Sequence, residues 1–199
     1  MSCFYHLCST GSCEVCLQII YMERKQFLAM GLAALPLYSF AQAIDPSKPF
    51  IVRAGKARYG EPMFYKGKHP NNIVIAKKDT NNAFSVFSYT GYDKTGPSLH
   101  LHTDQDEMFF VTEGKYRFRV GEEMMEAEVG DTIFLPRNVQ HSWIQLTDKG
   151  SMLYAVHPAG TMEEFFIEMS KMRSAPTAEQ AKEIHAKHGM KLLGPPMTL

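Results

Sequence analysis

The chain has 199 residues, and its 21 Lys and Arg balance its 21 Asp and Glu, so the formal net charge at neutral pH is zero. This balance gives no basis for a nucleic-acid partner or for a strongly acidic partner surface. Hydrophobic residues make up 45% of the sequence, as in ordinary globular proteins, and the length suits one domain with extensions.

The first 43 residues differ in character from the rest. From Met22, a basic start is followed by an apolar run over residues 27–40 and then by Ala41-Gln42-Ala43. This order is typical of a secretory signal peptide over residues 22–43, and the apolar run is too short to span a bilayer comfortably. We therefore expect translation to start at Met22, which makes residues 1–21 an over-long start, and cleavage to follow Ala43. The mature protein is then periplasmic or extracellular, with no stable membrane span.

All four cysteines lie in this leader, at Cys3, Cys8, Cys13 and Cys16. Cys13-x-x-Cys16 has the spacing of half a redox or zinc site, but no second pair accompanies it. Cleavage after Ala43 leaves a domain without cysteine, which can form no disulfide and is indifferent to an oxidising compartment. A retained, uncleaved anchor is the alternative.

The region from 44 to 160 consists of short β-type runs separated by turn residues. We expect a first strand at 50–53, a loop over 58–69, and further strands at 73–76, 83–92, 98–102, 107–111, 115–120, 125–129, 131–135, 141–146 and 152–156. Many short antiparallel runs of this kind suit an all-β, double-sheet jelly roll.

Residues 161–199 predict a helical extension that packs on the barrel. Thr161–Glu164 and Thr177–Gln180 each have the pattern of a capping box at the start of a helix. The first helix carries an apolar stripe at helical spacing, which we interpret as its barrel-facing side. His185 and His188 are three apart on the second helix, where a solvated helix end is favoured over a metal site.

The segment 96–107 holds the residues with metal-ligand chemistry. In a strand, His100 and His102 point to the same face. Glu107 follows four turn-forming residues, and a bend there could return it to the side of the two histidines. His141 follows a turn at 136–138. Three neutral imidazoles and one carboxylate suit a divalent transition metal with open positions, whereas a lone His-x-His pair would indicate only a polar strand face.

These residues resemble the two motifs of the cupin superfamily. The first motif, G-x5-H-x-H-x4-E-x6-G, is matched from His100 to Gly114, except that Lys94 stands at the opening glycine and Gly96 lies nearby. The second, G-x5-P-x-G-x2-H-x3-N, is matched from Gly130, with Asn138 at a glycine position and Gln145 at the final Asn. Asparagine is the next-best residue after glycine for a left-handed turn.

The resemblance implies a double-stranded β-helix, the jelly-roll cupin barrel, over residues 44–160. It also implies one divalent transition metal, which could be Fe, Mn, Ni, Co, Cu or Zn. By the resemblance the ligands of this metal are His100, His102, Glu107 and His141.

Strand alternation predicts the side chains that face the interior near this site. They are Phe109, Tyr116, Phe118, Met125, Trp143 and Gln145. No Lys or Arg points inward on the motif strands. Such a lining favours a flat, weakly polar ligand over a dicarboxylate or a sugar phosphate, although the same side chains would fill any barrel core.

The ending at 192–196 and the run at 79–85 are similar to those of small single-domain cupins related to quercetin dioxygenase. This resemblance implies a dioxygenase-type oxidoreductase that acts on a small aromatic or enolic compound. Glu107 is then also the catalytic residue, as general base on a bound hydroxyl. A homodimer through edge strands is common in the family. The alternatives are an oxygen-independent isomerase, epimerase or lyase, and a non-catalytic protein that binds a metal or small ligand.

Overall fold

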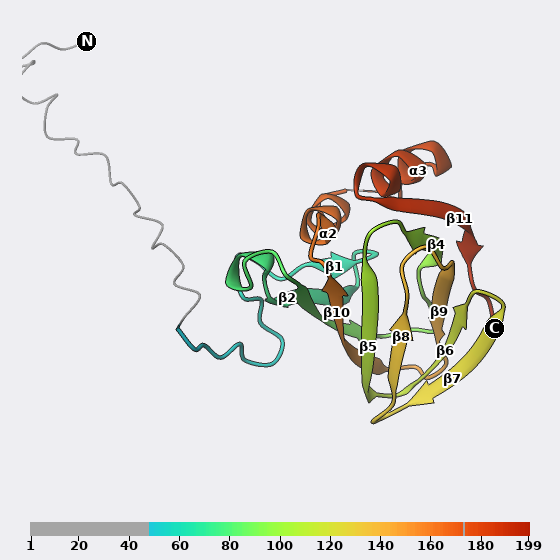
Figure 1. Ribbon diagram of the computed structural model, residues 1–199. Helices are drawn as coiled ribbons and strands as arrows, with labels where there is room; N and C mark the ends of the chain where they lie inside the picture. The colour runs from blue at the N-terminus through green and yellow to red at the C-terminus, as the bar shows by residue number, and fades with distance from the viewer. Residues whose placement is uncertain (1–47, 173) are drawn as a thin grey trace, which may run out of the picture. The chain divides into compact units, whose positions relative to one another are not determined.

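The computed structural model of the protein describes residues 48–172 and 174–199. The β-strands of these residues form two antiparallel sheets (Figure 1), and the predicted all-β jelly roll with two C-terminal helices is confirmed. The predicted start at Met22, the signal peptide, its cleavage after Ala43 and the four cysteines lie outside the described residues. Within the described part of the chain, no helix is both long and apolar enough to cross a bilayer.

The first sheet has six strands in the order β1-β2-β3-β10-β5-β8. Its strands are β1 (Phe64–Tyr65), β2 (His69–Ile75), β3 (Ser85–Gly91), β10 (Gly150–His157), β5 (Asp106–Glu113) and β8 (Thr132–Leu135). The second sheet has five strands in the order β11-β4-β9-β6-β7. They are β11 (Met190–Pro196), β4 (Ser98–His102), β9 (His141–Gln145), β6 (Lys115–Val120) and β7 (Glu123–Glu128). A short 3-10 helix, η1 (Lys77–Asp79), follows β2, and the helices α2 (Met162–Ser170) and α3 (Ala178–Lys187) precede β11.

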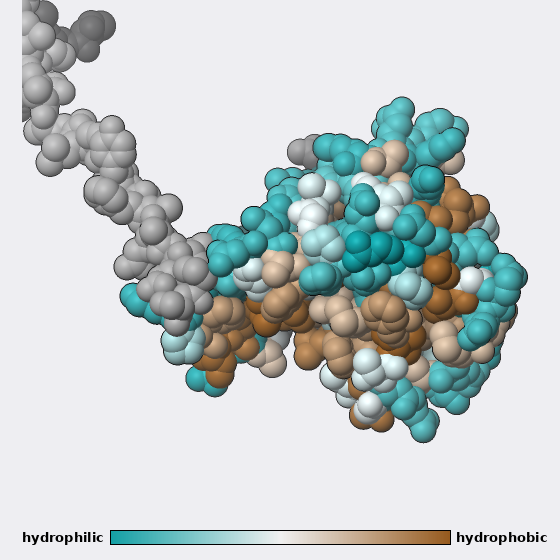
Figure 2. All heavy atoms as spheres, in the orientation of Figure 1, coloured by the Kyte–Doolittle hydropathy of each residue, from teal (hydrophilic) through white to brown (hydrophobic). Residues whose placement is uncertain are grey.

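Side chains from both sheets form one apolar core. The largest fully buried ones include Tyr116, Phe87, Phe118, Leu135 and Met152. On β6 the alternation is as predicted, because Tyr116 and Phe118 are buried while the residues between them are not. The outer face of the six-stranded sheet is less polar than alternation predicts, since Phe110, Phe134 and Leu153 are exposed on neighbouring strands. Figure 2 shows apolar residues gathered over this part of the sheet.

The first predicted strand, at 50–53, is wrong. These residues form no strand, and the guanidinium of Arg58 lies 3.6 Å from the centre of the Phe50 ring. Phe50 therefore makes a cation–π contact instead of pairing with a neighbouring strand. The predicted loop at 58–69 instead contains β1, which forms a hairpin with β2.

The extension after residue 160 is not wholly helical. Its last segment is β11, which pairs with β4 so that Met190 lies opposite His102 and Leu192 opposite His100. Pro195 and Pro196 hid this strand from sequence reasoning, because proline lacks the N–H that a central strand needs. They are tolerated here because β11 is an edge strand.

Helix α2 is held by its acidic residues rather than by the predicted capping box. Thr161 makes no side-chain cap hydrogen bond. The carboxylate of Glu163 is buried and accepts hydrogen bonds from Ser85 Oγ (2.6 Å) and from the backbone N–H of Lys77, and Glu164 pairs with Lys77 Nζ. These tertiary contacts replace the local cap and tie α2 to the six-stranded sheet. The second predicted box does form, between Thr177 and Gln180.

The chain just before β4 is tightly packed at Gly96. A Cβ at this position would lie 1.7 Å from the carbonyl oxygen of Trp143, which is backbone and cannot rotate away. We expect Gly96→Ala to lower the free energy of unfolding by about 2 kcal/mol or more, as overpacking does. The control is Gly194→Ala, whose Cβ would make only ordinary contacts with Leu99. Urea unfolding of both variants is the measurement, and an equal effect of the two would contradict the packing described here.

Candidate metal centre

Four side chains from both sheets meet at one end of the barrel, and we call them the histidine–glutamate group: His100, His102, Glu107 and His141. The first two lie on β4, and His100 is paired across the sheet with His141 on β9. Glu107 comes from β5, in the opposite sheet. All four residues are buried, and one candidate ligand atom from each lies within 4.8 Å of the others.

The bend between β4 and β5 brings Glu107 back to the histidines, as the turn residues predicted. The chain leaves the second sheet after His102 and enters the first at Asp106. Arg137, from the second-motif turn, holds this corner through its backbone N–H and its guanidinium, which both donate to the carboxylate of Asp106. Asn138 has a left-handed φ of 62°, as its place in the motif predicted, and its N–H donates to the carbonyl of His102 (2.7 Å).

Each histidine of the group has an oxygen at its Nδ1. His100 Nδ1 lies 2.8 Å from the carbonyl oxygen of Ser98, and His141 Nδ1 lies 2.9 Å from that of Val139. His102 Nδ1 lies 3.2 Å from the side-chain oxygen of Gln105. Carbonyl oxygens only accept, so each Nδ1 carries the proton and each Nε2 keeps a free lone pair. This is the arrangement in which the outer contacts of metal-binding histidines fix the ring and its tautomer.

Burial favours the neutral form of two histidines of the group. Burial, followed by the neighbouring His141 and His102 rings, lowers the pKa of His100 to about 3. Burial also lowers the pKa of His102, against the opposing effect of Glu107. Neutral imidazoles and an ionised carboxylate are the forms that bind a metal.

Two buried imidazole nitrogens of the group are placed so that they could bind a cation. His102 Nε2 and His141 Nε2 are buried and have no hydrogen-bond partner among the described residues, and they face the oxygens of Glu107 at 3.6 and 3.4 Å. An unpartnered buried acceptor costs about 1–3 kcal/mol, and lone pairs aimed at a carboxylate repel it. A divalent transition metal between them would replace this repulsion by coordination, so the residues fit such an ion.

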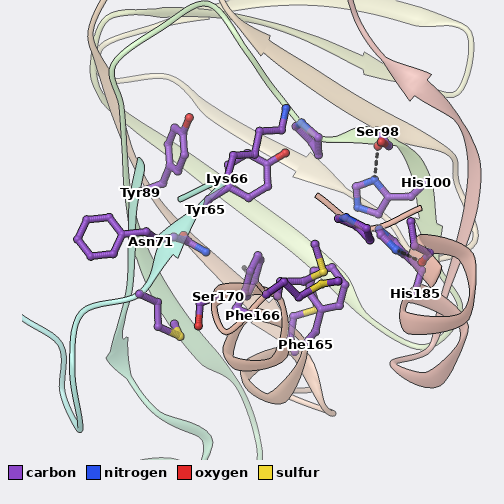
Figure 3. Close-up of a pocket in the computed structure, with 18 of the residues that line it drawn as sticks. Tyr65, Lys66, Asn71, Tyr89, Ser98, His100, Phe165, Phe166, Ser170 and His185 are labelled. Carbon is purple, nitrogen blue, oxygen red and sulfur yellow. Dashed lines mark hydrogen bonds between the residues drawn. The ribbon is translucent and has the colours of Figure 1, made fainter. Parts of the chain in front are cut away.

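A cavity of about 620 Å³ opens beside the histidine–glutamate group. His100 and Glu107 lie in its wall, and aromatic rings form much of the rest: Tyr65, Tyr89, Phe109, Trp143, Tyr154, Phe165 and Phe166. Figure 3 shows Tyr65, Tyr89, Phe165 and Phe166 around this space, with His100 hydrogen-bonded to Ser98 beside it. The volume is in the range that takes a small organic ligand.

The six predicted lining residues divide into two sets. Phe109 and Trp143 line the cavity. Tyr116 and Phe118 are completely buried in the core, Met125 packs against that core, and none of these three belongs to the cavity wall. Gln145 is also outside the wall, because its side chain is buried and donates to the carbonyl of Thr147 (2.8 Å). Strand alternation identifies inward side chains but does not tell the filled end of the barrel from the open one.

Sequence reasoning missed the part of the wall that lies outside the motif strands. The apolar stripe of α2, predicted only to pack on the barrel, lines the cavity through Met162, Phe165, Phe166 and Met169. Lys66, in the β1–β2 turn, also lines it. The stripe itself was the available signal, because an amphipathic helix beside an open barrel end covers that end with its apolar side.

The two helix histidines are not at a solvated helix end, so that interpretation was wrong. His185 lines the cavity, with its ring centre 5.0 Å from that of Phe165 and 6.2 Å from that of His100. Burial lowers the pKa of His185. His188 is buried, and its Nε2 lies 3.0 Å from a carboxylate oxygen of Glu168. The cause is that β11 joins the sheet directly after α3 and brings the end of this helix against the barrel.

Comparison with known proteins agrees with this geometry. Residues 91–157, which include both motifs, match the family model described as "Cupin domain". Quercetin 2,3-dioxygenase of Bacillus subtilis (strain 168) is 26% identical over 122 residues, which are 61% of this chain but only 35% of that protein. The match therefore spans about a third of that relative, and what the whole relative does is not transferred by it.

Solved structures of similar fold have lower identity. One is an RmlC-like cupin from Shewanella frigidimarina NCIMB 400, with 20% identity and a TM-score of 0.46 over 53% of this chain and 87% of that chain. Another is a predicted oxalate decarboxylase from Thermotoga maritima, with 17% identity and a TM-score of 0.42 over 45% of this chain and 79% of that chain.

Gln105 is expected to orient the candidate metal ligand His102 without contacting the metal itself. Its amide donates to the carbonyls of Pro158 and Ala159, which fixes its oxygen toward His102. We expect Gln105→Leu to weaken zinc binding by about 10- to 100-fold, as loss of an outer contact does. Competition with a chromophoric chelator measures this. Gln140→Leu, which removes a half-buried glutamine whose side chain bonds Glu122, is the control, and equal zinc affinities in both variants would contradict the role of Gln105.

The low pKa of His100 predicts acid sensitivity of the metal-free protein. The unfolded chain takes up a proton at this residue below its ordinary pKa of about 6.5, whereas the folded chain does so only near pH 3. Stability present above pH 6.5 is therefore lost as the pH falls, by about 2 kcal/mol from this residue between pH 7 and pH 5. Urea unfolding in the presence of a chelator measures this. Between pH 7 and pH 5 the free energy of unfolding of His100→Gln should fall by about 2 kcal/mol less than that of the wild type. An unchanged loss would rule out a neutral, buried His100.

Proposed function

Because this chain is a small protein of the cupin superfamily, we propose that it is a metal-dependent, dioxygenase-type oxidoreductase acting on a small aromatic or enolic compound. The single observation that carries the proposal is that His100 and Glu107, half of the histidine–glutamate group, lie in the wall of an aromatic cavity. A ligand stacked in that cavity would have its reacting end at the group. Similarity to quercetin 2,3-dioxygenase of Bacillus subtilis supports the same class of reaction.

A divalent transition metal bound by the group would supply Lewis acidity and, where it is redox-active, a means for dioxygen to react with an electron-rich ring. The chain's own contribution is to hold the ligand and to move a proton. Aromatic side chains such as Phe109, Trp143 and Phe165 exclude water and orient a flat substrate. In a dioxygenase reaction both oxygen atoms enter the product, so the substrate itself supplies the electrons and no further reductant is needed.

Glu107 is the residue we assign to proton transfer. It is the one carboxylate among the described residues that line the cavity, so it is the acidic side chain that a bound hydroxyl meets. A carboxylate is a weak base toward a free alcohol. It is matched better to an enol or phenol whose proton is already acidic, and this agrees with the proposed substrate class.

Oxygen uptake by metal-loaded protein tests the proposal. Iron-, manganese-, nickel-, cobalt- and copper-loaded samples are offered flavonols and other aromatic enols in a sealed oxygen electrode, with product analysis. We expect consumption of one dioxygen per substrate, and we expect Glu107→Gln to reduce the rate by about 100-fold or more relative to any loss of metal measured in the same sample. Glu113→Gln changes an acidic residue of the same strand that bonds Lys149 and Ser151, and it should keep the rate.

Three outcomes would contradict the proposal. Turnover that proceeds equally under nitrogen would indicate an isomerase, epimerase or lyase. Thermal stabilisation by a ligand without any product would indicate a binding protein. Absence of both uptake and binding across the ligand set would remove the aromatic substrate class itself.

A further inference from the structure

The described residues that line the cavity include one positively and one negatively charged side chain. Among the described residues that line it, Lys66 is the one Lys or Arg and Glu107 the one Asp or Glu. Once a dication is bound, the carboxylate of Glu107 neutralises only one of its two charges. The cavity then has two uncompensated positive charges, one at the metal and one at Lys66, and this favours an anionic ligand.

Lys66 occupies a backbone conformation that lysine rarely adopts. It is the first residue of the tight turn between β1 and β2, where Lys66 has a φ of 50° and Gly67 a φ of 67°, and Lys68 N–H donates to the carbonyl of Tyr65 (3.2 Å). Glycine or asparagine fits such a turn at lower cost, and a longer side chain there costs about 1 kcal/mol or more. The turn places the lysine side chain over the mouth of the cavity, where the residue is exposed.

The ammonium of Lys66 is held by neutral groups. Its Nζ donates to Thr95 Oγ1 (2.8 Å) and to the carbonyl oxygen of Gly96 (2.9 Å), and it lies 5.2 Å from the centre of the Tyr65 ring. An ammonium has three N–H donors, so one stays available for a ligand. Figure 3 shows this side chain beside the Tyr65 ring on the cavity wall.

The nearby carboxylate of Asp93 acts on this charge from a distance but forms no ion pair with Lys66. Asp93 uses one oxygen to pair with Lys68 Nζ (2.6 Å) and the other to pair with His69 Nε2 (3.0 Å). In the described part of the chain, Lys66 forms no ion pair of its own, whereas Lys68, two residues away, does. The two lysines therefore differ in the feature that matters for ligand binding.

The position of Lys66 also gives an upper limit to the length of the ligand. Its Nζ is bound to Gly96, four residues before His100 on the same run of chain, and four residues span at most about 14 Å. A ligand that reaches from the histidine–glutamate group to Lys66 therefore spans no more than about this distance between its two polar ends, which is the scale of a single ring with a short side chain. The aromatic wall between them suits a planar body.

We propose that Lys66 binds a carboxylate of the ligand, and that the substrate class is a planar aromatic acid whose enol or phenol end faces the histidine–glutamate group. Lys66 is then a specificity-determining residue that selects the acid over its uncharged analogues. The assignment of the reacting end rests on the proposed function, whereas the charge selection rests on the contacts of Lys66 and on the positive charge that a bound metal would add, whatever the reaction.

Binding to zinc-loaded protein tests this without any turnover, because zinc is redox-inert. The probes are caffeate, which has a catechol at one end and a carboxylate at the other, and its uncharged methyl ester. Isothermal titration calorimetry measures both against the wild type, Lys66→Met and Lys68→Met. We expect the wild type to prefer caffeate over the ester. In Lys66→Met this preference should fall by about tenfold, the value of one charge-assisted hydrogen bond, and in Lys68→Met it should be kept.

Any of three results would overturn the proposal: equal binding of caffeate and ester by the wild type, an equal effect of the two lysine variants, or no measurable binding of caffeate at millimolar concentration. Thermal melts of the variants verify that each is folded. Zinc-loaded protein can bind the acid whether or not other metal forms consume oxygen, so failure of the dioxygenase proposal and failure of this one are separate observations.

Discussion

The structure depends on a repulsive arrangement that a bound metal ion would relieve. Two buried imidazole nitrogens, on His102 and His141, direct free lone pairs at the carboxylate of Glu107 from 3.6 and 3.4 Å. Oxygens at the opposite nitrogens hold the rings in this tautomer, so they cannot turn away without losing those contacts. Because the histidines belong to one sheet and Glu107 to the other, an ion at this point would also cross-link the two sheets. A metal bound at this point would therefore also stabilise the barrel.

The same end of the barrel is the end that stays open. Core side chains such as Tyr116 and Phe118 fill the remainder, and a buried, fully bonded Gln145 lies among them. The opening is covered by α2, which Glu163 fastens to the six-stranded sheet, and is bounded on one side by the β1–β2 turn. The arrangement gives an aromatic cavity with a candidate metal site in its wall and a lysine among its lining residues, and the planar acidic ligand is proposed from this combination.

The double-sheet barrel and the meeting of the histidine–glutamate group were predictable from strand alternation, turn residues and the resemblance to the two cupin motifs. A two-residue spacing on a strand puts His100 and His102 on one face, and turn residues before Glu107 allow the chain to return. The cavity was less predictable because its wall is assembled from distant segments. Alternation could not tell that Tyr116 belongs to the filled end, and nothing local marks Lys66 as a wall residue. The edge strand β11 was hidden by prolines that only an edge position permits.

The most direct test of the central claim is anomalous diffraction from crystals of the zinc-loaded protein. The account predicts one strong peak per chain, about 2.0–2.2 Å from Nε2 of His100, His102 and His141 and from a carboxylate oxygen of Glu107. A peak bound by other residues, or no peak while all four side chains keep the positions described here, would contradict it.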